Sequence, residues 1–149
     1  MYGYAVTLPS GWRSKQAIYP YRWDGQSQLA IESAEVDKFM SSSTPAAWAV
    51  ATRWKRNLAA FTRFSVAWNA RYHGDTCPAE PASRNPVTIG GQPGVLLAYD
   101  CGILINLAAT VHGGYGYWFL FRDGGVQAAS DPTDRATFLG MLRSVQFPA

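Results

Sequence analysis

The chain has 149 residues, a length typical of one domain, and 48% of them are hydrophobic, which excludes a disordered protein. Only 15% are charged, which excludes a coiled coil, and no apolar stretch approaches the roughly 20 residues that span a bilayer. Thirteen basic and ten acidic side chains leave a net charge of +3, so a protein that binds anionic surfaces is the weakest of the classes left open.

The N-terminal part of the chain is predicted to contain two strands. Tyr4–Leu8 alternates along its length and stops at Pro9-Ser10-Gly11, which predicts a strand followed by a turn. Residues 17–25 are rich in aromatic residues and are interrupted by Pro20, so we expect an irregular or edge segment there. Gln28–Ser33 has the pattern of a second strand.

The middle of the chain is predicted to be helical. Thr44 and Pro45 have the pattern of a helix start, with Thr as the N-cap and Pro at the first helical position. Farther on, apolar residues recur at steps of three and four, at Trp54, Leu58, Phe61, Phe64, Trp68 and Tyr72. Trp48 does not fall on this stripe, so the helix could break near Asn57, which could cap a second helix. His73-Gly74-Asp75 is expected to end the helical region.

The remainder is predicted to form a loop, a run of strands and a last helix. Residues 75–86 are expected to be a loop and residues 87–89 a short strand. Three consecutive strands follow at residues 95–101, 103–111 and 115–122, and His112-Gly113-Gly114 predicts a tight hairpin between the last two.

The C-terminal helix is expected to begin at Asp131 and Pro132, with Gln146-Phe147-Pro148 returning to the sheet. Its predicted buried stripe consists of Phe138, Met141, Leu142 and Val145. The whole layout predicts an α+β fold, with a mostly antiparallel sheet flanked by one long central helix, or two, and by the C-terminal helix.

Three segments of the sequence are similar to those of a known superfamily. Tyr4–Trp12 resembles a strand that ends in a Pro-x-Gly-Trp turn, Ile89–Gly94 a glycine turn that leads into a strand, and Phe138–Phe147 a final helix with its tail. In this order they resemble the PsbP-like superfamily, which includes photosynthetic PsbP proteins, Ran-binding Mog-type proteins and bacterial lipoproteins. The resemblance implies one domain over residues 1–149, an α/β/α sandwich, and binding or assembly roles without shared catalytic residues.

Cys77 and Cys101 are the only cysteines, and neither belongs to a CxxC pair or a His/Cys cluster, so zinc is not expected. An even count in a small aromatic-rich domain favours one disulfide over two free thiols and thereby indicates an oxidising compartment. We therefore expect an extracytoplasmic protein, either secreted or membrane-anchored. The first residues lack the pattern of a signal peptide, so a targeting or anchoring segment would lie outside this chain.

Aromatic residues near the N-terminus are the main candidates for a binding site. Trp12, Tyr21, Arg22, Trp23 and Asp24 lie in segments without helical or strand periodicity. The rings would supply contact area in a patch for a ligand or partner, and the two charged groups would orient it. The same rings could instead close the open edge of a small core, and the sequence leaves both readings open.

Two further functions remain as alternatives. A small hydrolase or thiol-dependent enzyme would use His73 or His112 as its base, but no Gly-x-Ser-x-Gly elbow is present and no catalytic residue is assigned. An anionic-surface binder would use a basic helix face of Arg53, Arg56, Arg63 and Arg71, since no acid occurs between Asp37 and Asp75. The ordinary alternative for these arginines is a solvated face.

The sequence gives no sign of a cofactor or metal. We expect a monomer that binds an unidentified protein or small molecule rather than nucleic acid.

Overall fold

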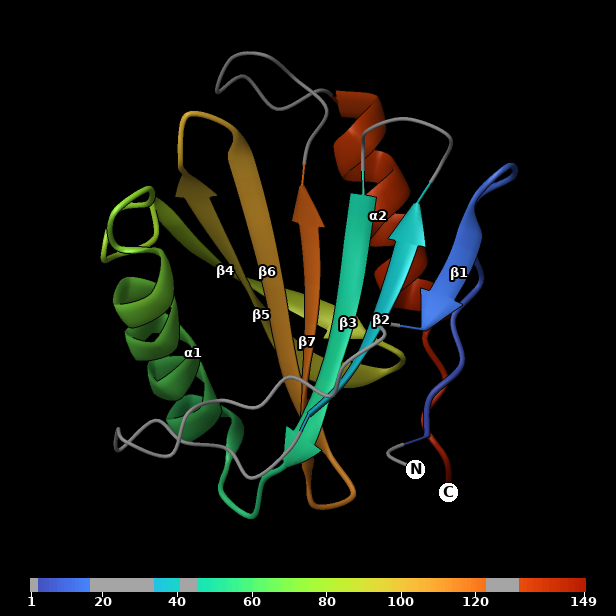
Figure 1. The fold of residues 1–149 in the computed structure, drawn as a ribbon. Coiled ribbons are helices and arrows are strands. Elements are labelled where there is room, and N and C mark those ends of the chain that lie inside the picture. Colours follow the sequence, from blue (N-terminus) through green and yellow to red (C-terminus); the bar gives the residue numbers. More distant parts are fainter. Residues whose placement is uncertain (1–2, 17–33, 41–45, 123–131) are drawn as a thin grey trace.

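The computed structural model describes residues 3–16, 34–40, 46–122 and 132–149, which form a seven-stranded sheet between two helices (Figure 1). Every strand pair in this part of the chain is antiparallel, and the strand order is β1-β2-β3-β7-β6-β5-β4. The strands are β1 (Arg13–Gln16), β2 (Ala34–Met40), β3 (Ala46–Arg53), β4 (Ser83–Ile89), β5 (Gln92–Asp100), β6 (Leu104–His112) and β7 (Tyr115–Arg122). The helices are α1 (Leu58–His73) and α2 (Pro132–Ser144).

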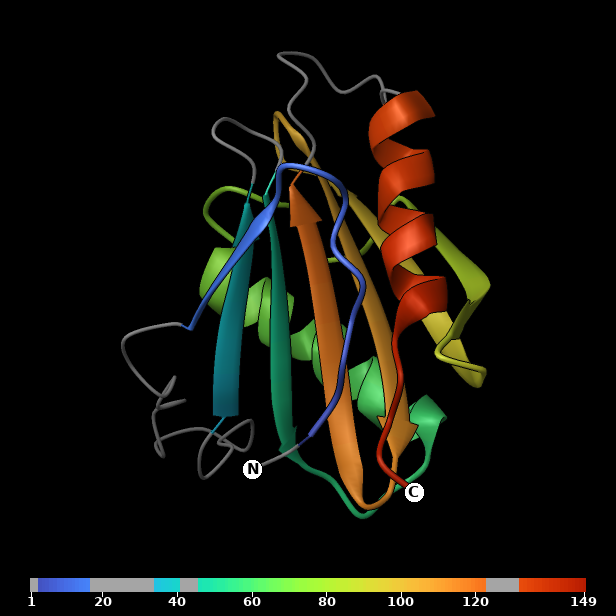
Figure 2. The same ribbon diagram turned by 90° about the vertical axis from the view of Figure 1, so that its right-hand side faces the viewer.

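The two helices cover opposite faces of the sheet, which confirms the expected α/β/α sandwich (Figures 1 and 2). α1 packs against β6, and α2 contacts β4 on the other side. Figure 2 shows residues 3–12 and the C-terminal tail running side by side over the α2 face.

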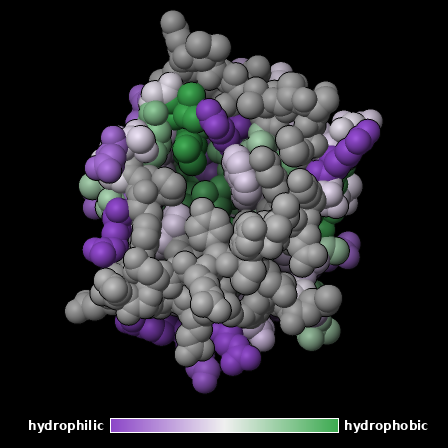
Figure 3. All heavy atoms as spheres, viewed as in Figure 1, coloured by the Kyte–Doolittle hydropathy of each residue, from purple (hydrophilic) through white to green (hydrophobic). Residues whose placement is uncertain are grey.

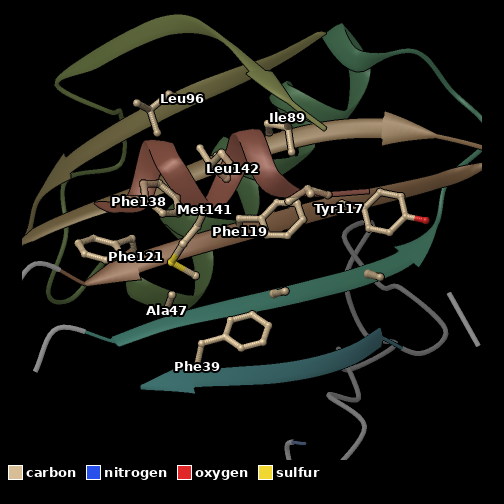
Figure 4. Close-up of a cluster of buried hydrophobic side chains, with 14 residues drawn as sticks. Phe39, Ala47, Ile89, Leu96, Tyr117, Phe119, Phe121, Phe138, Met141 and Leu142 are labelled. Carbon is tan, nitrogen blue, oxygen red and sulfur yellow. The ribbon is translucent and has the colours of Figure 1, made fainter. Parts of the chain in front are cut away.

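Each face of the sheet has its own hydrophobic core. Along β7, Tyr117, Phe119 and Phe121 belong to the α2 core, whereas Trp118 belongs to the α1 core. Figure 4 shows the α2 core, in which these β7 rings lie close to side chains of α2. Because successive residues of a strand point to opposite faces, a central strand covered on both sides must be apolar throughout.

Residues 46–53 form strand β3, so the helix predicted to start at Thr44-Pro45 is wrong for this stretch. Three of its four alanines lie directly opposite aromatic residues of β7, among them Ala47 opposite Phe121 and Ala49 opposite Phe119. Small residues leave room for the large rings on the neighbouring strand, and this packing overrides the helical preference of alanine.

α1 begins where the sequence places the second helix. The Oδ1 atom of Asn57 accepts a hydrogen bond of 2.9 Å from the backbone N–H of Ala60, so Asn57 is the N-cap. The helix ends at His73, as expected. Phe61 and Trp68 of the predicted stripe are buried.

Tyr4–Leu8 is not a strand of the sheet. Within the described part of the chain, its one bridge pairs Ala5 with Gln146, and the backbone N–H of Thr7 donates to Ser144 Oγ at 3.0 Å. Tyr4, Val6 and Leu8 still pack on the α2 core, so the alternating pattern identifies the buried side correctly. The segment pairs with the returning C-terminal tail, which occupies the place predicted for it.

The predicted loop at residues 75–86 is too long, because β4 already begins at Ser83. β4 is an edge strand, and Pro86 is tolerated there because an edge has a side without ladder hydrogen bonds. The three strands that follow, the hairpin at Gly113-Gly114 and the buried stripe of α2 are confirmed. The predicted segments at 17–25 and 28–33 and the N-cap Asp131 lie outside the described residues, and β1 and β2 were not predicted.

Candidate functional site

The two cysteines form the expected disulfide. Cys77 follows α1 and Cys101 follows β5, with an S–S distance of 2.01 Å and 4.3 Å between the Cα atoms. The bond joins the loop after α1 to the turn between β5 and β6. Both sulfurs are thereby used, so the oxidised protein has no thiolate for the thiol-dependent reaction considered from the sequence.

His112 lies at the opposite end of β6 from the disulfide. Its ring stacks on Phe147 with centroids 5.0 Å apart, and its Nε2 atom lies 3.1 Å from the carbonyl oxygen of Pro148. β6 runs for nine residues from Leu104 to His112, which is about 26 Å from end to end at the usual rise per residue. His112 therefore holds the C-terminal tail and does not approach the sulfurs. His73 is the last residue of α1, and its side chain is outside the described part.

The predicted aromatic patch is described in part only. The ring of Trp12 is half-buried and stacks on Phe121 at 6.4 Å, so one side of it belongs to the α2 core. Tyr21, Arg22, Trp23 and Asp24 lie outside the described residues. The patch therefore stays a prediction.

The predicted basic residues do not share one helix face, because Arg53 ends β3 and Arg56 precedes the N-cap of α1. Only Arg63 and Arg71 are on the helix. All four side chains are exposed, and a common basic surface remains a prediction.

The α1 core contains a group of stacked rings centred on Trp118. The indole N–H of Trp118 donates to Ser65 Oγ at 2.6 Å, and the ring stacks on Phe61 and Phe64 at 5.4 and 5.6 Å. Gly116 lets α1 approach, since a Cβ atom there would lie 2.4 Å from the ring of Phe61. These contacts fix α1 over one end of β7.

The other end of this face carries apolar side chains that are only half-buried. They are Trp48 of β3, Ile105 of β6 and Leu120 of β7. Sequence reasoning missed them as a group because it placed Trp48 in a helix. The available signal was that Trp48 does not fit the helical stripe.

Tyr99 of β5 is fully buried on the α1 side, and its hydroxyl has no hydrogen-bond partner within the described structure. Burial raises its pKa to about 12, since ionisation would leave a charge in the core. At neutral pH the buried hydroxyl is a cost, because it lost its hydrogen bonds to water.

We expect Tyr99→Phe to raise the free energy of unfolding by about 1 kcal/mol at neutral pH. Tyrosine in the unfolded chain ionises near pH 10, so the wild type should lose stability as pH rises from 10 toward 12. The variant should lose less stability over this range, because Tyr99 no longer contributes, while Tyr117, whose pKa is also raised by burial, still does. Urea unfolding at several pH values measures both effects, and a variant less stable than the wild type at pH 7 would contradict them.

The described residues contain no group of three or more His, Cys, Asp or Glu side chains that could hold a metal ion. No helix among them is long and apolar enough to span a membrane.

Among solved structures, the chain is similar to the solution structure of cyanobacterial PsbP (CyanoP) from Synechocystis sp. PCC 6803, with a TM-score of 0.62. The match covers 98% of this chain and 87% of the other at 13% sequence identity. The chain has a PsbP-like fold. No family model matches the sequence, and no curated protein matches it significantly. The PsbP-like fold expected from the three sequence segments is confirmed, and at this identity the likeness concerns the fold alone.

Proposed function

We propose that the chain is a non-catalytic binding or assembly module that presents an aromatic patch to a protein or a small ligand. The patch comprises Trp12, Tyr21, Arg22, Trp23 and Asp24. The single observation that supports a non-catalytic role most is the disulfide, because it joins both sulfurs and leaves no thiolate, while His112 lies at the far end of β6 from it. A nucleophile and its base need hydrogen-bond contact.

The disulfide supports a place of action outside the reducing cytoplasm. We therefore extend the proposal to an extracytoplasmic protein. As a separate part of the proposal, the protein acts as a monomer. Intact mass under denaturing, non-reducing conditions, with and without a thiol reagent, tests the bond in protein isolated from its own cells. Two alkylated cysteines in unreduced protein would contradict this part of the proposal.

Trp23→Ala tests the patch. If Trp23 contacts a partner and not the core, the free energy of unfolding should stay within about 0.5 kcal/mol of the wild type, while the partner that co-purifies from the producing cells is lost. The control Arg143→Ala changes an exposed side chain on α2 and should keep that partner. Phe121→Ala, a core change, should cost about 3–5 kcal/mol. A comparable loss for Trp23→Ala would mean that its ring closes the core, and the patch would be wrong.

A further inference from the structure

An apolar row crosses three strands on the α1 face beyond the end of the ring stack. Trp48 of β3 is the register partner of Leu120 of β7, which pairs on its other side with Leu107. Ile105 of β6 lies two residues from Leu107 on the same face, so it is a diagonal neighbour of Leu120. The three half-buried members of this row, Trp48, Ile105 and Leu120, are called the apolar row below.

α1 leaves this row partly open. The helix packs its rings on Trp118, which is 1% exposed, whereas Leu120, the next residue of β7 on this face, is only half-buried. Figure 3 looks onto this side of the sheet and shows strongly hydrophobic side chains that lie deeper than the hydrophilic side chain coloured beside them. The recess makes a concave surface suited to an inserted side chain.

A positive charge lies beside the apolar row. Arg122 ends β7, pairs in register with Ile105, and by strand alternation shares the face of Leu120. It is exposed, and no ion pair of Arg122 occurs within the described residues, where the one salt bridge joins Arg84 to Glu80. α1, on the same side, carries the exposed Arg63 and no acidic residue. Among the described residues, the charges beside the row are therefore positive, which favours a negatively charged occupant.

We propose that the apolar row and Arg122 bind a protein partner through an acidic segment that inserts an apolar side chain. This inference rests on the proposed function as a binding module but not on the aromatic patch. Tryptophan and arginine beside aliphatic side chains are the composition of protein interfaces. Trp48 is the one ring of the row, and the aliphatic Ile105 and Leu120 offer no second ring on which a successive nucleic-acid base could stack. A recessed surface is also unsuited to a lipid bilayer, which accepts protruding groups.

The test uses the ¹⁵N-labelled full chain and the synthetic peptide Glu-Glu-Leu-Leu-Glu-Glu. We expect saturable shifts of the backbone amides of Ile105, Leu120 and Arg122 and of the indole N–H of Trp48. Arg122→Glu should weaken binding about ten-fold, because it places like charges together. Arg143→Glu, an equal charge change on α2 across the sheet, should leave the affinity nearly unchanged, and a peptide with lysines in place of the glutamates should not bind.

No shift at millimolar peptide, or equal binding by Arg122→Glu, would overturn the proposal. So would shifts at these residues caused by phosphatidylglycerol vesicles or oligothymidylate when the peptide causes none. Arg122→Glu leaves the core untouched, so thermal unfolding should match the wild type. A co-purifying partner lost on Arg122→Glu but retained on Trp23→Ala would support this surface and contradict the aromatic patch. Loss of the partner on Trp23→Ala alone would support the aromatic patch and contradict this surface.

Discussion

Phe61→Ala should lower the free energy of unfolding by about 3–5 kcal/mol. The Phe61 side chain is 0% exposed and contacts three other rings, those of Trp54, Phe64 and Trp118. Its removal leaves a cavity between α1 and the sheet that these large rings cannot fill by small movements. Urea unfolding gives the value, and Arg63→Ala on the exposed side of α1 should change it by less than about 0.5 kcal/mol.

The contact between Phe61 and Gly116 allows a sharper test of the same packing. Gly116→Ala alone should be strongly destabilising, since its Cβ would lie 2.4 Å from Cε2 of Phe61. In the Phe61→Ala background the same methyl group enters the cavity, so Gly116→Ala should cost much less there. Additive effects of the two changes would show that the ring does not rest on Gly116.

Local patterns predicted those elements whose structure depends on nearby residues. The cap at Asn57, the glycine hairpin and the buried stripe of α2 each involve residues a few positions apart. β3 depends on a distant strand, because its alanines are explained by the rings of β7 more than sixty residues later. By itself, an alanine-rich segment after Thr44-Pro45 has a helical pattern, and no nearby residue indicates that it forms a strand.

The candidate sites show the same dependence on sequence separation. With only two cysteines a single pairing is possible, so the disulfide could be predicted without knowledge of the fold. The apolar row could not, because its members come from β3, β6 and β7 and meet only through strand pairing. The four arginines were grouped on one helix face because Arg53 was assigned to a helix, whereas it ends β3.

Removal of the disulfide by Cys77→Ala with Cys101→Ala should lower the free energy of unfolding by about 3 kcal/mol. The bond closes a loop with a sequence separation of 24, and its loss gives the unfolded chain more conformations. Reduction of the wild type should lower its urea midpoint by a similar amount, whereas the double variant should not respond to the reductant.

The reductant control separates the cross-link from the packing of the sulfurs. Cys77 is 7% exposed, so its replacement also removes buried contacts, whereas reduction leaves every side-chain carbon in place. If reduction lowers stability as much as the double variant does, the cross-link accounts for the effect.

The bond also ties the end of α1 to the turn before β6, so its loss should expose backbone amides of residues 74–82 to faster hydrogen exchange than those of β6. A reduced protein with an unchanged midpoint and unchanged exchange would contradict a stabilising role, and an oxidising compartment would then have no basis in stability.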